Sequence, residues 1–106
     1  MRESEYQAKV VRRLRAMFPG CIILRNDPRF IQGIPDLIVL WHNCWAALEV
    51  KIDADAPVQP NQQFYLEEMD KMSFAMFIYP EIEDEVLYDL QRSFESQRQT
   101  RFSKSK

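Results

Sequence analysis

The sequence predicts an α/β fold in which helices flank a mixed β-sheet. Two stretches, residues 2–18 and 60–72, repeat apolar residues at helical spacing. Short apolar runs have the length and composition of strands, and they lie at residues 21–24, 37–41, 44–50 and 74–79. The last two runs are separated by a helix, as in a right-handed parallel β-α-β crossover. The predicted order is therefore helix, three strands, helix and strand, with an extra helix at the C-terminal end.

Composition limits the class of protein. A chain of 106 residues with 46% hydrophobic content is enough for one domain with one core. The net charge of -2 does not by itself indicate nucleic-acid binding, so any such binding must use local basic patches. The sequence shows no apolar run long enough to span a membrane and no signal peptide, so we expect a cytoplasmic protein. Cys21 and Cys44 fit no metal-binding spacing and are expected to be buried thiols.

The first helix, residues 2–18, ends before Gly20. Its apolar stripe passes through Val10 and Leu14, and Glu3 projects near the centre of that stripe. Glu5 projects to the opposite side. An acidic residue on a buried face needs a partner or a cation. Alternatively, Glu3 is simply a residue of the frayed first turn, where the helix dipole favours it.

The central stretch is a β-hairpin, with apolar runs on either side of His42 and Asn43. A symmetric turn there pairs residues whose numbers sum to 85, so Asp36 lies across from Glu49. Directly opposed side chains are about 5 Å apart. Lys51 shares the face of Glu49. Two carboxylates this close repel each other, and a divalent cation with oxygen ligands would explain their placement.

The remaining segments add candidate residues. The loop at residues 25–34 carries Arg25 and Arg29, which suit a polyanionic substrate unless they are merely solvated. The helix at residues 60–72 has Gln62 on its apolar side. Its side chain is either part of the functional site or an amide exposed at the protein surface near the start of the helix. We expect a core at residues 1–80, and a helix at 81–97 packed on that core or at a dimer interface. Residues 98–106 read as a basic, disordered tail.

The motif is Pro35-Asp36, followed after twelve residues by Glu49-Val50-Lys51. It resembles the motif of PD-(D/E)XK nucleases. The surrounding GIPDLIVL and ALEVK are similar to the VRR-Nuc family of that superfamily, and the resemblance extends over residues 3–79. The predicted element order is that of the PD-(D/E)XK nuclease core. Relatives often have a glycine between the second helix and the last strand, where this chain has Lys71-Met72-Ser73. That departure concerns a turn and leaves the motif intact.

The resemblance implies an Mg²⁺-dependent endonuclease, with Mn²⁺ as a substitute, that hydrolyses phosphodiester bonds in DNA. It implies a homodimer acting on branched DNA such as a Holliday junction. The implied metal ligands are Glu3, Asp36, Glu49 and the backbone carbonyl of Val50, with Glu5 replacing Glu3 if the register shifts by two. The implied catalytic residues are Asp36, Glu49, Lys51 and Gln62, with Gln63 as the alternative to Gln62. The competing interpretation is a catalytically silent nucleic-acid-binding module with a nuclease-like fold.

Overall fold

The protein folds into one four-stranded sheet with helices on both of its faces. The structure, a computed structural model, describes the backbone of residues 1–104 and the side chains of residues 1–98. The elements are α1 (Glu3–Met17), β1 (Ile22–Arg25), β2 (Leu37–Trp41), β3 (Cys44–Val50), α2 (Pro60–Met72), β4 (Phe74–Ile78), a 3-10 turn (Pro80–Ile82) and α3 (Glu83–Lys104). Strands β1, β2 and β3 are antiparallel neighbours, and β4 is parallel to β3. The predicted αβββαβ order and mixed sheet are confirmed.

The register of the β2–β3 hairpin is the one predicted. Leu37 pairs with Leu48, and Trp41 pairs with Cys44, so paired positions sum to 85. His42 occupies the turn with a left-handed φ of 55°. The two-residue turn fixes the register of both strands, because a slip of one residue would turn every buried side chain to the other face. Asp36 and Glu49 therefore follow as the next opposed pair beyond the last pair of the ladder.

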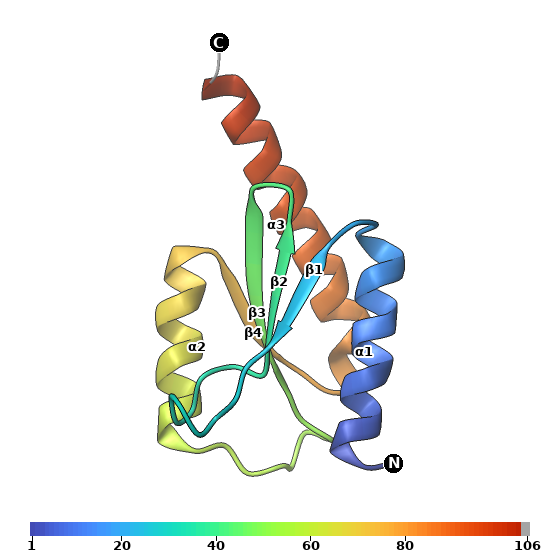
Figure 1. Cartoon of the computed structure of the whole chain (residues 1–106), viewed down its shortest axis with the longest axis vertical. Coiled ribbons are helices and arrows are strands. Elements are labelled where there is room, and N and C mark those ends of the chain that lie inside the picture. Colours follow the sequence, from blue (N-terminus) through green and yellow to red (C-terminus); the bar gives the residue numbers. More distant parts are fainter. Residues whose placement is uncertain (105–106) are drawn as a thin grey trace.

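Helices cover the sheet from two sides. Helices α1 and α3 pack against one face through a cluster that includes Leu14, Leu48 and Phe94. Helix α2 packs against the other face, where Leu66 meets Ala47 and neighbouring side chains. Figure 1 shows α1 and α2 on opposite sides of the sheet. None of the helices within residues 1–104 has the length and hydropathy that crossing a membrane requires.

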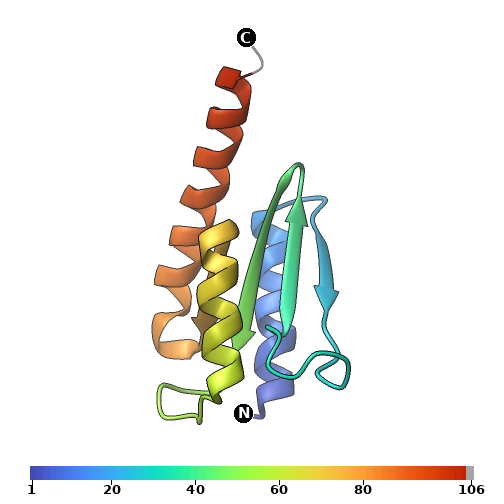
Figure 2. The ribbon, with the colours of Figure 1, turned by 90° about the vertical axis from the view of Figure 1, so that its left-hand side faces the viewer.

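The C-terminal helix differs from the expectation. We expected a helix at residues 81–97 and a disordered tail at 98–106, but α3 begins at Glu83 and continues to Lys104. Residues 105–106 lie outside the described part of the chain. No glycine or proline follows Pro80, and the basic and glutamine residues of this segment are good helix formers. The apolar stripe of α3 is buried in the chain's own core, while its last turns run past the hairpin end of the sheet (Figure 2).

One end of the sheet collects the irregular segments. The loops between β1 and β2 and between β3 and α2 lie at the end opposite the hairpin turn, together with the first turns of α1 and α2 (Figure 1). Asp36 precedes β2, and Lys51 follows β3, so both belong to this end. The fold therefore gathers the motif residues at the end of the sheet where the pairing of β2 with β3 has stopped.

Gly33 holds the β1–β2 loop against α2. Its φ is +89°, and an added Cβ would lie 2.3 Å from Cβ of Asn61. Gly20 is a matched control, because its φ is +87° but nothing lies within 4 Å of an added Cβ. We expect Gly20→Ala to lower the free energy of unfolding by about 1 kcal/mol through the positive φ alone. Gly33→Ala should cost a further ~1–3 kcal/mol from overpacking. Urea denaturation measures both, and equal losses would contradict the contact with Asn61.

Candidate active site

Two hydrogen bonds that involve carboxylates link Asp36 to the end of β3. The backbone N–H of Asp36 donates to Oε1 of Glu49 at 3.1 Å, and the backbone N–H of Val50 donates to Oδ2 of Asp36 at 2.9 Å. The two carboxyl groups also interact directly. The structure therefore brings together the two acidic residues that the hairpin register predicted to be opposed.

Lys51 and Gln62 complete the network. Nε2 of Gln62 donates to Oε2 of Glu49 at 2.7 Å, and Oε1 of Gln62 accepts a hydrogen bond from Nζ of Lys51 at 2.9 Å. Nζ also donates to the carbonyl oxygen of Pro57 at 2.9 Å and lies 3.7 Å from Oε2 of Glu49. Three oxygens thus surround Nζ, which matches the three donors of an ammonium group. Lys51 is accordingly a buried cation held beside a buried acid.

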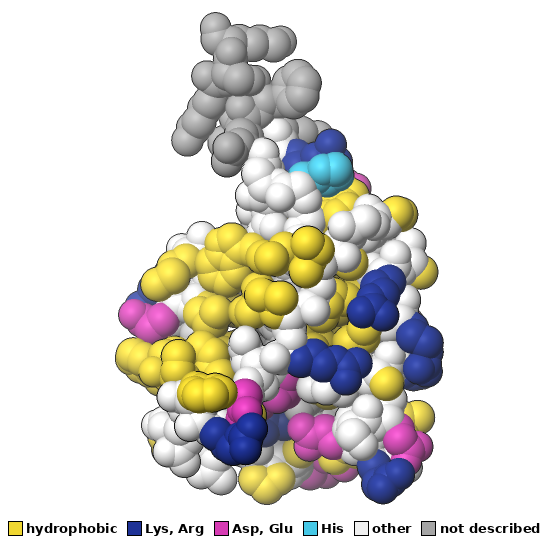
Figure 3. Space-filling view, viewed as in Figure 1, with side chains coloured by type: hydrophobic (Ala, Val, Ile, Leu, Met, Phe, Trp, Pro, Cys, Tyr) yellow, Lys and Arg dark blue, Asp and Glu magenta, His cyan; other side chains and the backbone are white. Residues whose placement is uncertain are grey.

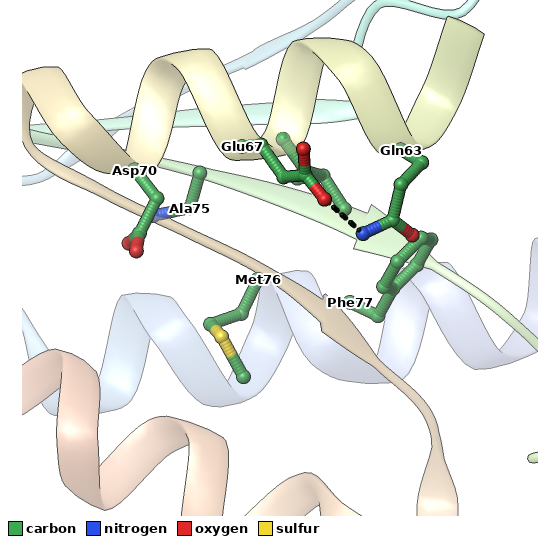
Figure 4. Close-up of a pocket in the computed structure, with 7 residues that line it drawn as sticks. Gln63, Glu67, Asp70, Ala75, Met76 and Phe77 are labelled. Atoms are coloured by element: carbon green, nitrogen blue, oxygen red, sulfur yellow. Dashed lines mark hydrogen bonds between the residues drawn. The ribbon is translucent and has the colours of Figure 1, made fainter. Parts of the chain in front are cut away.

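The start of α2 fixes Gln62. The backbone N–H of Gln59 donates to Oε1 of Gln62 at 3.0 Å, and the side chain of Gln59 accepts from the backbone of Gln62, so the two residues form a capping box. Gln63 instead donates to Glu67 at 2.7 Å on the outer side of α2, beside β4 (Figure 4). The hollow there, about 190 Å³, is lined by the acidic residues Glu67 and Asp70 and therefore does not suit a polyanion. Of the two glutamines, the structure brings Gln62 into the network.

Burial changes the acidity of Glu49. Its side chain is almost fully buried, and this burial raises its pKa to about 8, with a further rise from the charge of Asp36 and an opposing effect from Lys51. The carboxyl group consequently holds a proton at neutral pH when no cation is bound. A divalent cation would replace this proton, because a metal-bound carboxylate must be deprotonated.

The raised pKa predicts how stability depends on pH. The folded, metal-free protein retains the Glu49 proton up to about pH 8, whereas the unfolded chain loses it near the ordinary value of 4.5. The folded state binds more protons in this window, so the free energy of unfolding should fall as pH rises, by at most about 1.4 kcal/mol per pH unit. Urea melts in EDTA at pH 5, 6, 7 and 8 measure the slope. Glu49→Gln should flatten it, and an equal slope in this variant would contradict the assignment.

The donors present fit a hard divalent cation. Asp36 and Glu49 offer carboxylate oxygens, and Mg²⁺ is commonly held by one or two carboxylates, with water and substrate phosphate as its other ligands. Within the described residues, no group of three or more His, Cys, Asp or Glu side chains is placed to hold a metal. The chemistry and charge of the pair fit Mg²⁺, while a cage made of protein side chains alone is not formed.

Glu3 is not brought to this pair. It is the first residue of α1 and is exposed, because the buried stripe of α1 begins one turn later at Tyr6, so its position is that of the first-turn alternative. Glu5 is also exposed and pairs with Arg2 at 3.0 Å. The role of Glu3 as a metal ligand stays a prediction.

The two loop arginines differ in their surroundings. Arg25 ends β1, is exposed, and has no ion pair among the described residues. Its strand partner is Leu37, so the side chain of Arg25 leaves the sheet on the face opposite to that of Asp36. Both residues lie at the same end of the sheet. Arg29 is exposed and pairs with Asp27 at 2.6 Å, and this guanidinium holds the pKa of Asp27 below its usual range. Arg25 is the better placed of the two for a polyanion.

Sequence reasoning missed two contributors to the network. Gln59 had a readable signal, since it stands three residues before Gln62 and directly before the proline that opens α2, which is the spacing of a capping box. The carbonyl of Pro57, which accepts from Lys51, had none, because a backbone carbonyl has no residue-specific signature. Its position follows from the path of the β3–α2 loop.

The fold is an α/β domain in which two acidic residues, a lysine and a glutamine form one hydrogen-bonded network at one end of the sheet. The chain is similar to a solved structure described as "VRR_NUC domain", with a TM-score of 0.66 and 24% identity over 81% of this chain and 94% of that one. It is also similar to a "VRR_NUC domain protein", with a TM-score of 0.64 and 19% identity over 90% of this chain and 89% of that one. No protein-family model and no curated protein matches the sequence. The protein therefore has the VRR_NUC domain fold.

Proposed function

We propose that this protein is a metal-dependent endonuclease that hydrolyses phosphodiester bonds in DNA. The observation that carries the proposal is the continuous network of Asp36, Glu49, Lys51 and Gln62 at the open end of the sheet. The VRR_NUC fold, a fold of nucleases, supports it. A buried acid, Glu49, and a partly buried one, Asp36, beside the buried Lys51 are costly for stability, and such groups are typical of catalytic sites.

Mg²⁺ is the proposed cofactor, with Mn²⁺ as a substitute. Asp36 and Glu49 would hold it through their carboxylates, the backbone carbonyl of Val50 would add a third oxygen, and Glu3 is the expected fourth protein ligand from α1. When bound, the ion supplies a Lewis acid that polarises the phosphate and lowers the pKa of an attacking water. The raised pKa of Glu49, caused first by burial and then by the charge of Asp36, fits this role, because a bound cation would stabilise the deprotonated carboxylate in its buried position.

The side chains of the network then have separable roles. Lys51, with three acceptors around Nζ, acts as a fixed positive charge that stabilises the negative charge gathering on the phosphate in the transition state. Gln62 is a positioning residue, since it contacts both Lys51 and Glu49 and is itself held by the capping box. The start of α2 thereby sets the distance between the lysine and the acids.

The proposed substrate is branched DNA, cleaved by a homodimer. A chain this small has little surface for reading sequence, and two copies would present two sites to two strands. Hydrophobic side chains gather over the sheet and α2 in Figure 3. Ile22 and Leu24 of β1 are themselves 59% and 47% exposed. Such a patch is available for contact with a second copy.

Cleavage of a matched DNA set tests the proposed function. The set contains a four-way junction, a flap, a linear duplex and a single strand, each incubated with Mg²⁺ or Mn²⁺ and with EDTA. We expect metal-dependent cleavage that is fastest on branched DNA, and light scattering should give the mass of a dimer. Binding without cleavage under any metal condition would favour the catalytically silent module instead.

The two loop arginines give a matched test of DNA binding. Arg25→Ala removes a cation that has no described ion pair, whereas Arg29→Ala removes one already paired with Asp27. We expect Arg25→Ala to weaken binding on all DNA sequences and to reduce the slope of log K against log salt by about 1. Arg29→Ala should change the slope less. Fluorescence anisotropy across a salt series measures both. Equal slopes for wild type and Arg25→Ala would show that Arg25 does not contact the DNA.

A further inference from the structure

A cavity of about 330 Å³ adjoins the candidate active site, between the β1–β2 loop and the first turn of α2. Gln62 lines this cavity and also donates to Glu49, so the cavity opens directly beside the proposed catalytic acids. Its side-chain lining consists of carboxamides and proline rings, namely Gln32, Gln59, Asn61, Gln62, Pro28 and Pro60. None of the described residues that line it carries an ionisable side chain.

This lining selects a class of ligand. Carboxamides both donate and accept hydrogen bonds, as the edges of nucleobases do. Proline rings offer flat apolar surface. A phosphate group would need cations or several free N–H donors, and the lining has no cation. The cavity is within the range of small-ligand sites, roughly 300–1,000 Å³. Its chemistry therefore fits an uncharged, flat ring with donors and acceptors, which in a DNA substrate is a base.

An exposed aromatic side chain lies on the same loop. Phe30 is 86% exposed and makes no ring contact with the described residues, and Ile31 beside it is 47% exposed. Apolar side chains in such positions are used by DNA-binding proteins as wedges between base steps, which they unstack. Phe30 stands two residues before Gln32, so wedge and cavity belong to one short segment.

The segment is held in place relative to the acids. Asn26 donates through Nδ2 to the carbonyl of Pro35 at 2.7 Å and through its backbone N–H to the carbonyl of Asp36 at 2.8 Å. At the other side, Gly33 lies against Asn61 so closely that no side chain would fit between them. The loop is thus fixed at two places, through Asn26 to Pro35 and Asp36, and through Gly33 to α2.

We propose that the β1–β2 loop unstacks one nucleotide next to the scissile phosphate, with Phe30 taking the place of the base in the stack and the cavity receiving the base. This proposal rests on the proposed function, because it assumes a DNA substrate at Asp36 and Glu49. Unpairing and unstacking a base costs a few kcal/mol, and the cost is smallest when the base is already unpaired. DNA with an unpaired base at this position should therefore be bound and cleaved roughly 10²-fold better than fully paired DNA.

The test uses 2-aminopurine, whose fluorescence rises when it leaves the base stack, paired at the branch point of a flap substrate. The full chain is added in EDTA so that the DNA stays intact, and binding is followed separately by anisotropy. We expect wild-type protein to raise the fluorescence severalfold. Phe30→Ala and Gln32→Ala should lose most of this rise while keeping the wild-type melting temperature. Phe64→Ala is the matched control, since Phe64 is also an exposed aromatic residue but does not line the cavity.

The outcomes separate this proposal from the proposed function. Binding without any fluorescence rise, or an undiminished rise with Phe30→Ala, overturns base unstacking, even if cleavage is intact. A rise that depends on Phe30 and Gln32, together with no metal-dependent cleavage, upholds base unstacking and overturns the nuclease. If the protein binds none of the DNA substrates, both proposals are overturned.

Discussion

Replacing Asp36 by asparagine should reduce DNA cleavage by roughly 10³-fold, comparable with the loss of a preorganised charge-stabilising group. Asparagine keeps an oxygen that can accept the hydrogen bond from the Val50 backbone N–H, so the hairpin end should remain folded. The negative charge that attracts the cation is lost. The free energy of unfolding in EDTA at neutral pH should therefore stay about equal, because the proton on Glu49 already relieves its repulsion with Asp36.

The measurements are initial rates of cleavage and the change in melting temperature on adding Mg²⁺ or Mn²⁺. Wild-type protein should melt at higher temperature with the metal, since a ligand that binds only the folded state stabilises it. Asp36→Asn should lose this rise. Asp55→Asn, at an exposed acidic residue of the β3–α2 loop, is the control and should behave as wild type. Full activity in Asp36→Asn would show that the carboxylate of Asp36 is not needed for cleavage.

Replacing Lys51 by methionine should reduce cleavage by roughly 10²- to 10³-fold while leaving the metal response in place. Methionine keeps an apolar side chain of similar length but removes the charge from between Gln62, Pro57 and Glu49. Since Lys51 lowers the pKa of Glu49, its removal should also raise that pKa further. The variant should still gain melting temperature with Mn²⁺, because the two carboxylates remain.

The contrast between the two substitutions separates their roles. Loss of the metal response marks a ligand, whereas loss of cleavage with the response retained marks a residue that acts on the substrate. Lys71→Met is the matched control, because Lys71 is an exposed lysine of α2 whose partner is Glu68. If Lys51→Met cleaves DNA at the wild-type rate, the lysine has only a structural role.

The hairpin and its register could be predicted from the sequence because the polar break is two residues long and both strands are apolar apart from Glu49. That short turn leaves little freedom, so the approach of Asp36 to Glu49 followed from counting residues. Helix α2 was predictable for a similar local reason, since Pro60 suits a first turn and the apolar stripe follows it. These features depend on interactions between residues that are close in the chain.

Other features depend on contacts that a single sequence does not encode locally. Gln62 and Gln63 are adjacent on one helix, and only the packing of α2 on β3 turns Gln62 toward Glu49. The length of α3 was underestimated because its last turns lie beyond the apolar stripe from which the helix was predicted. The sequence left open whether Glu3 is buried or belongs to an exposed first turn, because helical periodicity does not tell where along α1 the contact with the core begins.

The most direct measurement is the anomalous scattering of Mn²⁺ in crystals of the wild-type protein. We expect one strong peak about 2.1 Å from carboxylate oxygens of both Asp36 and Glu49, the usual distance for a small divalent ion and its oxygen ligands. The peak should disappear in Asp36→Asn. A crystal in which Mn²⁺ binds elsewhere, with Asp36 and Glu49 still hydrogen-bonded only to protein, would contradict the account.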